Sequence, residues 1–136
     1  MNEISIKRIK QVLSECEDVA FVYIFGSGAG RTTVKQGSDL DMAVYFYRDP
    51  DLDQVYSFIK KIEDVTGEEV LDLLVLNGCE DFILRNEVLK GTLVFCRDVD
   101  LHASFFSWTL RMYEDQMIQM KRCAAGGDIE TRLKTI

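Results

Sequence analysis

Residues 19–47 read VAFVYIFGSGAGRTTVKQGSDLDMAVYFY, and this stretch decides how the chain folds. Its first part, Val19–Phe25, is rich in β-branched and aromatic residues and is too short for a typical helix, which predicts a buried strand. A glycine-rich loop is expected over residues 26–38, and a second strand over 40–47. A buried strand, a glycine-rich loop and a second strand are therefore expected in succession.

Helical and strand patterns continue on both sides of this segment. Apolar residues spaced by three and four predict one helix through Ile6, Ile9, Leu13 and Cys16. The other expected helices cover 52–66, 81–90 and 98–124, and the other expected strands cover 70–76 and 92–96. This order predicts an α/β or α+β fold in which helices pack on a single mixed sheet of about four strands.

The length and composition indicate an ordinary globular chain. With 136 residues it is expected to form one domain, over residues 1–125, with a flexible tail over 126–136. An apolar fraction of 47% with a single proline excludes a mainly disordered or low-complexity protein. The net charge of −7 would repel a phosphate backbone, so no direct binding of nucleic acid is expected.

The cysteines and the apolar runs indicate the cellular compartment of the protein. The four cysteines show no CxxC spacing, and the chain's single histidine cannot complete a zinc site with them. Four reduced thiols in a cytoplasmic protein are expected. The first residues lack the apolar core of a signal peptide, and no apolar run is long enough to span a membrane.

Three acidic residues occupy positions where a plain core would not place them. Asp39 and Asp41 flank Leu40 at the start of the second strand, and alternation along a strand points both carboxylates to one face. Asp72 interrupts the apolar run VLDLLVL. Adjacent carboxylates repel each other and a buried one needs a partner, so a hard cation such as Mg²⁺ would satisfy all three.

Each of these residues also has a simpler interpretation. Asp39 could make an Asx-type turn, Asp41 could face solvent on an edge strand, and Asp72 could pair with a buried arginine. The loop that precedes them could be a flexible surface loop, since a string of glycines alone is a weak signal. The loop could equally bring backbone N–H groups, the Ser27 hydroxyl and the Arg31 guanidinium to phosphate oxygens.

The spacing of these features resembles a known family. FGSGAG, then GSDLDMAV, and later LDLLVL resemble the nucleotidyltransferase superfamily that includes DNA polymerase beta, and more narrowly the minimal nucleotidyltransferases of the MntA antitoxin type. The resemblance implies a nucleotidyltransferase fold with a long C-terminal helix, ATP as substrate and Mg²⁺ as cofactor. It implies that Asp39, Asp41 and Asp72 are catalytic metal ligands. It further implies that Gly26, Ser27 and Arg31 bind the nucleotide.

The chain departs from the family pattern in the loop. Eleven residues separate Ser27 from Asp39, one more than is usual in the family, and Arg31 is shifted by one position. The resemblance implies transfer of AMP to a tyrosine hydroxyl of a HEPT-domain ribonuclease toxin, with release of pyrophosphate. Two alternatives are a catalytically weak module that neutralises the toxin by binding and a small-molecule nucleotidyltransferase.

The last helix carries more apolar surface than one core contact needs. One stripe comprises Leu101, Phe105, Trp108 and Met112. A second comprises Phe106, Leu110, Tyr113, Met117 and Met120. The stripes form either one wide core-facing surface or a core contact plus a partner surface, and methionines suit an adaptable interface. The resemblance favours a partner surface, with the HEPT toxin as the partner.

Overall fold

The computed structural model describes residues 3–25, 33–35, 41–67 and 72–125, which form four helices and six strands. The helices are α1 (Ile6–Ser14), α2 (Leu52–Thr66), α3 (Phe82–Leu89) and α4 (Val99–Ala125). The strands are β1 (Glu3–Ser5), β2 (Val19–Phe25), β3 (Thr33–Lys35), β4 (Asp41–Phe46), β5 (Asp72–Val75) and β6 (Thr92–Cys96). All four predicted helices and all four predicted strands are present, with bounds that differ by a few residues.

Four strands form one mixed sheet in the order β5-β4-β2-β6. β2 pairs antiparallel with both β4 and β6, whereas β4 pairs parallel with β5. β2 and β4 are therefore the central strands, and most of their side chains are buried. This confirms the predicted α+β class with a single mixed sheet of four strands and a long C-terminal helix.

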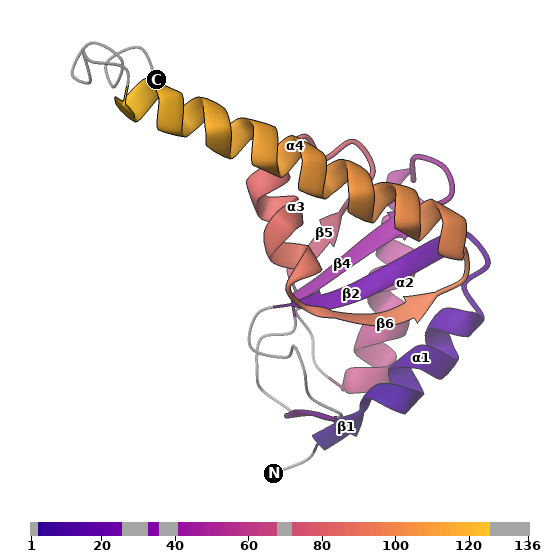
Figure 1. Ribbon diagram of the computed structural model, residues 1–136. Helices are drawn as coiled ribbons and strands as arrows, with labels where there is room; N and C mark the ends of the chain where they lie inside the picture. Colours follow the sequence, from indigo (N-terminus) through magenta and orange to yellow (C-terminus); the bar gives the residue numbers. More distant parts are fainter. Residues whose placement is uncertain (1–2, 26–32, 36–40, 68–71, 126–136) are drawn as a thin grey trace.

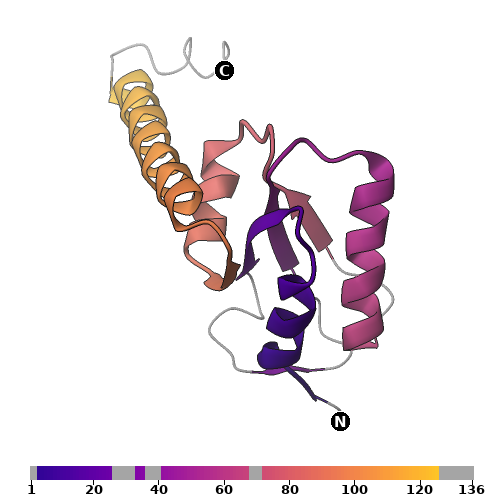
Figure 2. The same cartoon turned by 90° about the vertical axis from the view of Figure 1, so that its right-hand side faces the viewer.

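Helices cover both faces of this sheet. Figures 1 and 2 show α1 and α2 on one side and α3 and α4 on the other. Alternation along β2 supplies both cores, since Val22 and Ile24 pack with apolar side chains of α1 and α2. Phe21 and Tyr23 point the other way and pack with Phe105 of α4. Because both faces of β2 are buried, its sequence is a continuous apolar run without alternation.

The helix ends follow from local capping chemistry. The Asp51 side chain accepts a hydrogen bond from the Gln54 backbone, and the Gln54 side chain accepts one from the Asp51 backbone, which forms a capping box at the start of α2. Gly67 ends α2 in the left-handed region with φ 72°. Asp81 caps α3 by accepting from the Leu84 backbone N–H.

The structure corrects the expected loop over 26–38. Residues 33–35 form β3, which pairs antiparallel with β1 in a small second sheet, with Ile4 opposite Val34. Strands of three residues are too short for an alternating pattern to reveal, and this pair joins segments far apart in the chain. The described part of the third predicted strand begins at Asp72, because residues 70 and 71 lie outside the described residues.

Helix α4 extends past the sheet (Figure 1). Its core contact centres on Phe105 and Thr109, which are 4% and 0% exposed. Trp108, Phe106 and Met120 are 48%, 39% and 50% exposed, so the interpretation of both stripes as one wide core-facing surface is wrong. Among the described helices, none is long and apolar enough to cross a membrane. The expected flexible tail over 126–136 lies outside the described residues.

Candidate functional site

One row of the sheet brings two of the predicted site residues together. Asp41 is the first residue of β4 and Asp72 is the first residue of β5, and the parallel pairing of these strands places them directly opposite each other. On the other side of β4, Asp41 pairs with Phe25, the last residue of β2. Phe25, Asp41 and Asp72 therefore form one row across three adjacent strands.

This row is where the predicted phosphate loop leaves the sheet. Gly26 follows Phe25 in the chain, and Asp39 lies two residues before Asp41. Gly26, Ser27, Arg31 and Asp39 all fall outside the described residues, and so does the side chain of Asp72. Of the predicted site residues, the described structure therefore brings together the backbones of Asp41 and Asp72.

The position of Asp41 bears on its chemistry. β4 lies between β2 and β5, so the interpretation of Asp41 as the exposed side of an edge strand is wrong. Its side chain is half-buried, and it makes a contact of its own within the protein. A half-buried carboxylate on a central strand is an unusual position for a purely solvated charge.

The donors at this row suit a hard divalent cation. Carboxylate oxygens are the ligands that Mg²⁺ prefers, and Mg²⁺ is usually held by one or two carboxylates together with substrate phosphates. Asp41 and Asp72 supply two carboxylates from directly opposed backbone positions. Within the side chains that the structure describes, no group of three acidic, histidine or cysteine residues could hold a metal ion.

On the β6 side of this row, Gly91 lies in close contact with the backbone at the end of β2. A Cβ atom added to Gly91 would lie 2.3 Å from the Ile24 carbonyl oxygen and 2.9 Å from the Phe25 Cα atom. Gly91 therefore allows the turn between α3 and β6 to pack directly against the end of β2. The sequence alone indicates Gly91 only as a break between a helix and a strand, because the contact depends on strand order.

Lys90 precedes Gly91 and brings a positive charge to the same end of the sheet. Its Nζ atom lies 3.0 Å from the Glu87 Oε1 atom, and both side chains are exposed. The hydrogen bond from Lys90 to Glu87 raises the pKa of the lysine. The charge of Lys90 is thus offset by Glu87, three residues earlier in the chain.

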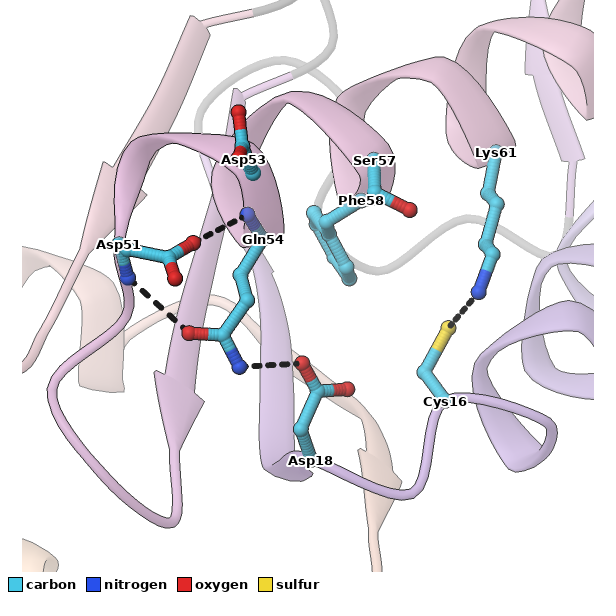
Figure 3. Close-up of a pocket in the computed structure, with 8 residues that line it drawn as sticks. All are labelled: Cys16, Asp18, Asp51, Asp53, Gln54, Ser57, Phe58 and Lys61. Atoms are coloured by element: carbon cyan, nitrogen blue, oxygen red, sulfur yellow. Dashed lines mark hydrogen bonds between the residues drawn. The ribbon is translucent and has the colours of Figure 1, made fainter.

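A separate hollow of about 240 Å³ lies in the α1 and α2 layer (Figure 3). Its polar groups are used by the fold itself, since Asp51 and Gln54 form the capping box and Gln54 Nε2 lies 3.4 Å from Asp18 Oδ2. Lys61 Nζ lies 4.0 Å from the Cys16 Sγ atom. Burial raises the pKa of the Cys16 thiol, which keeps it protonated and poorly nucleophilic.

This hollow is also remote from the acidic row. Asp18 precedes Val19, and Val19 pairs with Phe46 at the far end of β4 from Asp41. The five residue steps from Asp41 to Phe46 correspond to about 17 Å along a strand. We therefore place the candidate site at the row of Asp41 and Asp72 and assign the hollow in Figure 3 a structural role.

Comparisons with known proteins identify the family of the chain and the solved structures that share its fold. A model of the family described as polymerase beta, nucleotidyltransferase matches residues 7–100, which include both Asp41 and Asp72. A search of curated protein sequences found no match. The matched range ends at the start of α4, so this helix lies almost wholly beyond it.

Several solved structures share the fold over most of this chain. A mutant toxin–antitoxin MntA–HpeT crystal structure is 21% identical with a TM-score of 0.67, over 93% of this chain and 99% of that one. A toxin–antitoxin structure with AMP-PNP is 22% identical with a TM-score of 0.65, over 92% and 98% of the two chains. A third contains a tri-AMPylated HEPN toxin from Shewanella oneidensis in complex with an MNT antitoxin. It is 21% identical, with a TM-score of 0.62, over 92% and 95% of the two chains.

Proposed function

Because the chain belongs to the polymerase beta nucleotidyltransferase family, we propose that it transfers AMP from ATP to a tyrosine hydroxyl of a HEPT-type toxin protein and so acts as an antitoxin. The observation that carries this proposal is the pairing of Asp41 with Asp72 beside the end of β2. Support for the substrates comes from the structural neighbours, of which one holds AMP-PNP and one contains a tri-AMPylated toxin.

The roles of the acidic residues follow from the register of the sheet. Side chains at directly opposed positions on neighbouring strands project from the same face, and residues two apart on one strand share a face as well. The opposed backbone positions of Asp41 and Asp72 therefore favour one face of the sheet for both carboxylates. We propose that Asp39, two residues before Asp41 in the sequence, joins them. We assign these three carboxylates to binding Mg²⁺, which when bound offsets the negative charge of the triphosphate and of the departing pyrophosphate.

The loop after β2 binds the phosphates. Gly26 follows β2 directly, and glycines allow a backbone to approach a phosphate closely and to direct N–H groups at its oxygens. The Ser27 hydroxyl and the Arg31 guanidinium donate further hydrogen bonds. Together these groups orient the β- and γ-phosphates so that the α-phosphorus faces the acceptor.

The transfer step forms one bond, breaks one bond and moves one proton. The acceptor oxygen forms a bond to the α-phosphorus, and the bond between that phosphorus and the bridging oxygen of the β-phosphate breaks. The acceptor proton passes to a carboxylate at this site, for which Asp72 is the candidate, and pyrophosphate departs with the bonding electron pair. Most of the rate gain in such a reaction comes from positioning and charge neutralisation.

The acceptor protein docks in part through α4. This helix lies beyond the range of the family match, and its exposed apolar side chains exceed what the core needs. Residues 1–125 thus combine a transfer domain with a helix for the partner, in a protein that we place in the cytoplasm. The same exposed face favours a second candidate function, in which the protein neutralises the toxin by contact alone.

Intact-mass spectrometry of the toxin separates these two functions. The toxin encoded beside this protein is incubated with it, ATP and Mg²⁺, and is expected to gain one or more AMP units. The Asp39→Asn/Asp41→Asn variant is expected to lose this gain, whereas the Asp49→Asn control, in an exposed turn, retains it. Neutralisation by the double variant without any mass gain would overturn the transfer proposal in favour of contact alone.

A further inference from the structure

A second surface hollow, of about 480 Å³, lies on the opposite layer of the protein from the one in Figure 3. It lies between the turn after β5, the start of α3 and the middle of α4. Tyr45, at one wall, is four residues from Asp41, or about 14 Å along the strand. The hollow is therefore separate from the acidic row. Its lining also includes Cys79, the exposed carboxylate residue Glu80, Phe82, Arg85, Trp108 and Met112.

Arg85 is the chemically unusual member of this lining. Its side chain is only 9% exposed, yet its hydrogen-bond partners among the described residues include no carboxylate. Its Nε atom donates to Thr109 Oγ1 at 3.1 Å, and its Nη1 atom donates to the Cys79 carbonyl at 3.1 Å. The guanidinium also lies 4.3 Å from the centre of the Phe105 ring. Burial lowers the pKa of Arg85, which reflects the cost of holding this charge away from water.

The Arg85 guanidinium has further N–H donors that can form hydrogen bonds. An arginine carries five N–H donors, and the two hydrogen bonds described use two of them. Across the described residues, every side-chain nitrogen or oxygen atom that is shut off from solvent has a partner. No partner of the Nη2 atom is found in that part of the chain, so this atom opens to the hollow. The hollow thus exposes free N–H donors on an otherwise buried cation.

The walls around Arg85 resemble the centre of a protein interface. Trp108 is 48% exposed at the rim although it is a large aromatic residue, and Met112 and Phe82 are half-buried beside it. Tryptophan, tyrosine and arginine dominate the binding energy of protein interfaces, and methionine adapts to irregular partners. Further along α4, Ile118 is also 48% exposed.

We propose that this hollow, the Arg85 pocket, receives a carboxylate side chain of the partner protein, which pairs with the free N–H donors of Arg85 while apolar neighbours pack on Trp108. The inference rests on the proposed function, because the partner is the toxin. A partner carboxylate supplies the charge that the buried guanidinium lacks. A free anion is a poorer occupant, because it brings no apolar neighbours that would pack on the exposed Trp108.

The first test measures toxin affinity. Arg85→Met keeps an unbranched side chain at this position but removes the guanidinium that lies over Phe105, and it is expected to weaken toxin binding about 10- to 100-fold, mainly through faster dissociation. Trp108→Ala removes an exposed side chain, should leave the fold intact, and is expected to weaken binding about 10-fold. Arg111→Met, at an exposed position of the same helix, is the matched control and should bind like the wild type.

The second test identifies the occupant. Arg85→Lys places an amine at position 85, and a carbodiimide should join it to a carboxylate of the bound toxin through a zero-length amide bond. Peptide mass spectrometry is expected to find this link from position 85 to an aspartate or glutamate of the toxin. The same treatment of Arg111→Lys should give no such link from position 111.

The outcomes separate this inference from the proposed function. A wild-type protein that neither binds nor modifies the toxin overturns both. A wild-type protein that binds and modifies the toxin, while Trp108→Ala binds equally well and position 85 gives no cross-link, overturns the Arg85 pocket alone. If Arg85→Met fails to fold, the affinity of Trp108→Ala and the cross-link from position 85 still decide whether the Arg85 pocket binds the toxin.

Discussion

Asp41 and Asp72 occupy directly opposed positions at the first residues of two parallel strands, β4 and β5. Parallel neighbours start at the same edge of a sheet, so the residues that open both strands meet there. Of the next residues of the two strands, Met42 belongs to the hydrophobic core and Leu73, which is half-buried, packs against it. The two acidic residues therefore mark the boundary between the core and the candidate site.

Replacing Asp72 by Asn should abolish transfer while leaving the fold intact. Asn keeps the size of the side chain but removes the charge that binds the cation and accepts the proton, so we expect a loss of about a hundredfold or more in the rate of AMP transfer. In thermal unfolding, wild-type protein should be stabilised by Mg²⁺ with a non-hydrolysable ATP analogue, and Asp72→Asn should lose most of that shift.

The control for this experiment is Asp53→Asn. Asp53 is exposed in the first turn of α2, in the layer away from the acidic row, so this variant should keep both the transfer rate and the shift with Mg²⁺. An Asp72→Asn protein with an unchanged transfer rate would contradict the assignment of Asp72 to the site.

Gly91→Ala should destabilise the protein more than a typical glycine substitution. The added Cβ atom would lie 2.3 Å from the Ile24 carbonyl oxygen, and a backbone atom cannot move away as a flexible side chain can. We expect a loss of about 3 kcal/mol in the free energy of unfolding, measured by urea denaturation. The loss should be accompanied by weaker ATP binding, because the contact positions the end of β2.

Gly78→Ala provides the comparison. Gly78 has a φ of 73° but nothing within 4 Å of an added Cβ atom, so the only cost is the left-handed backbone, about 1 kcal/mol. Equal losses in the free energy of unfolding for the two variants would show that the contact between Gly91 and Ile24 adds nothing to the cost of the substitution.

The sequence predicts the helices and strands of this fold far better than it predicts which strands lie beside each other. Val19–Phe25 could be assigned as a buried strand because both of its faces are apolar, and Asp72 stood out because its own neighbours are apolar. That β5 lies beside β4 and not beside β6 depends on long-range packing, which local pattern does not encode. The spacing of Asp41 and Asp72 along the chain therefore suggests that they meet, but only the strand order places them opposite each other.

Other features left no readable trace in the sequence. Arg85 lies in a helix whose polar and apolar residues are poorly segregated, and both Arg85 and Asn86 are buried there. Thr109 is fully buried in α4, where it accepts the Arg85 hydrogen bond, whereas the apolar spacing includes Trp108 and not Thr109. Such polar contacts between helices depend on the angle at which the helices pack.

Arg97→Lys should loosen the end of α1. The Nη2 atom of Arg97 lies 2.9 Å from the Ser14 carbonyl and 3.2 Å from the Cys16 carbonyl, and its Nε atom lies 3.2 Å from the Val19 carbonyl. A guanidinium can bridge several carbonyls at the end of a helix, which a single ammonium cannot reproduce. Since part of Arg97 is open to solvent, we expect a moderate loss of about 1–2 kcal/mol by urea denaturation.

Faster hydrogen exchange over α1 should accompany that loss, while exchange over α3 stays unchanged. Arg48→Lys, in the exposed turn after β4, is the matched control and should change neither quantity. An Arg97→Lys protein as stable as the control would contradict the bridging role.

His102 should make the stability fall at acid pH. Its Nε2 atom lies 2.6 Å from the Tyr23 hydroxyl, and burial lowers the pKa of His102 below its usual 6.5. Burial also raises the pKa of Tyr23 to about 12, so the phenol keeps its proton and donates a hydrogen bond to the neutral ring when the ring proton is on Nδ1. The unfolded chain therefore binds a proton at His102 more readily than the folded one. The contribution of His102 to the free energy of unfolding is fully present above pH 6.5 and is lost as the pH drops through the lower folded pKa.

Because the chain has a single histidine, its titration can be followed by NMR without ambiguity. The ring should titrate below 6.5 in the folded protein, and urea denaturation should show the free energy of unfolding of the wild type decreasing between about pH 7 and pH 5. His102→Gln, which retains an acceptor for the Tyr23 hydroxyl but does not titrate, should show a smaller decrease over the same range. A folded pKa at or above 6.5, or equal slopes for the two proteins, would refute the coupling between this hydrogen bond and the packing of α4 on β2.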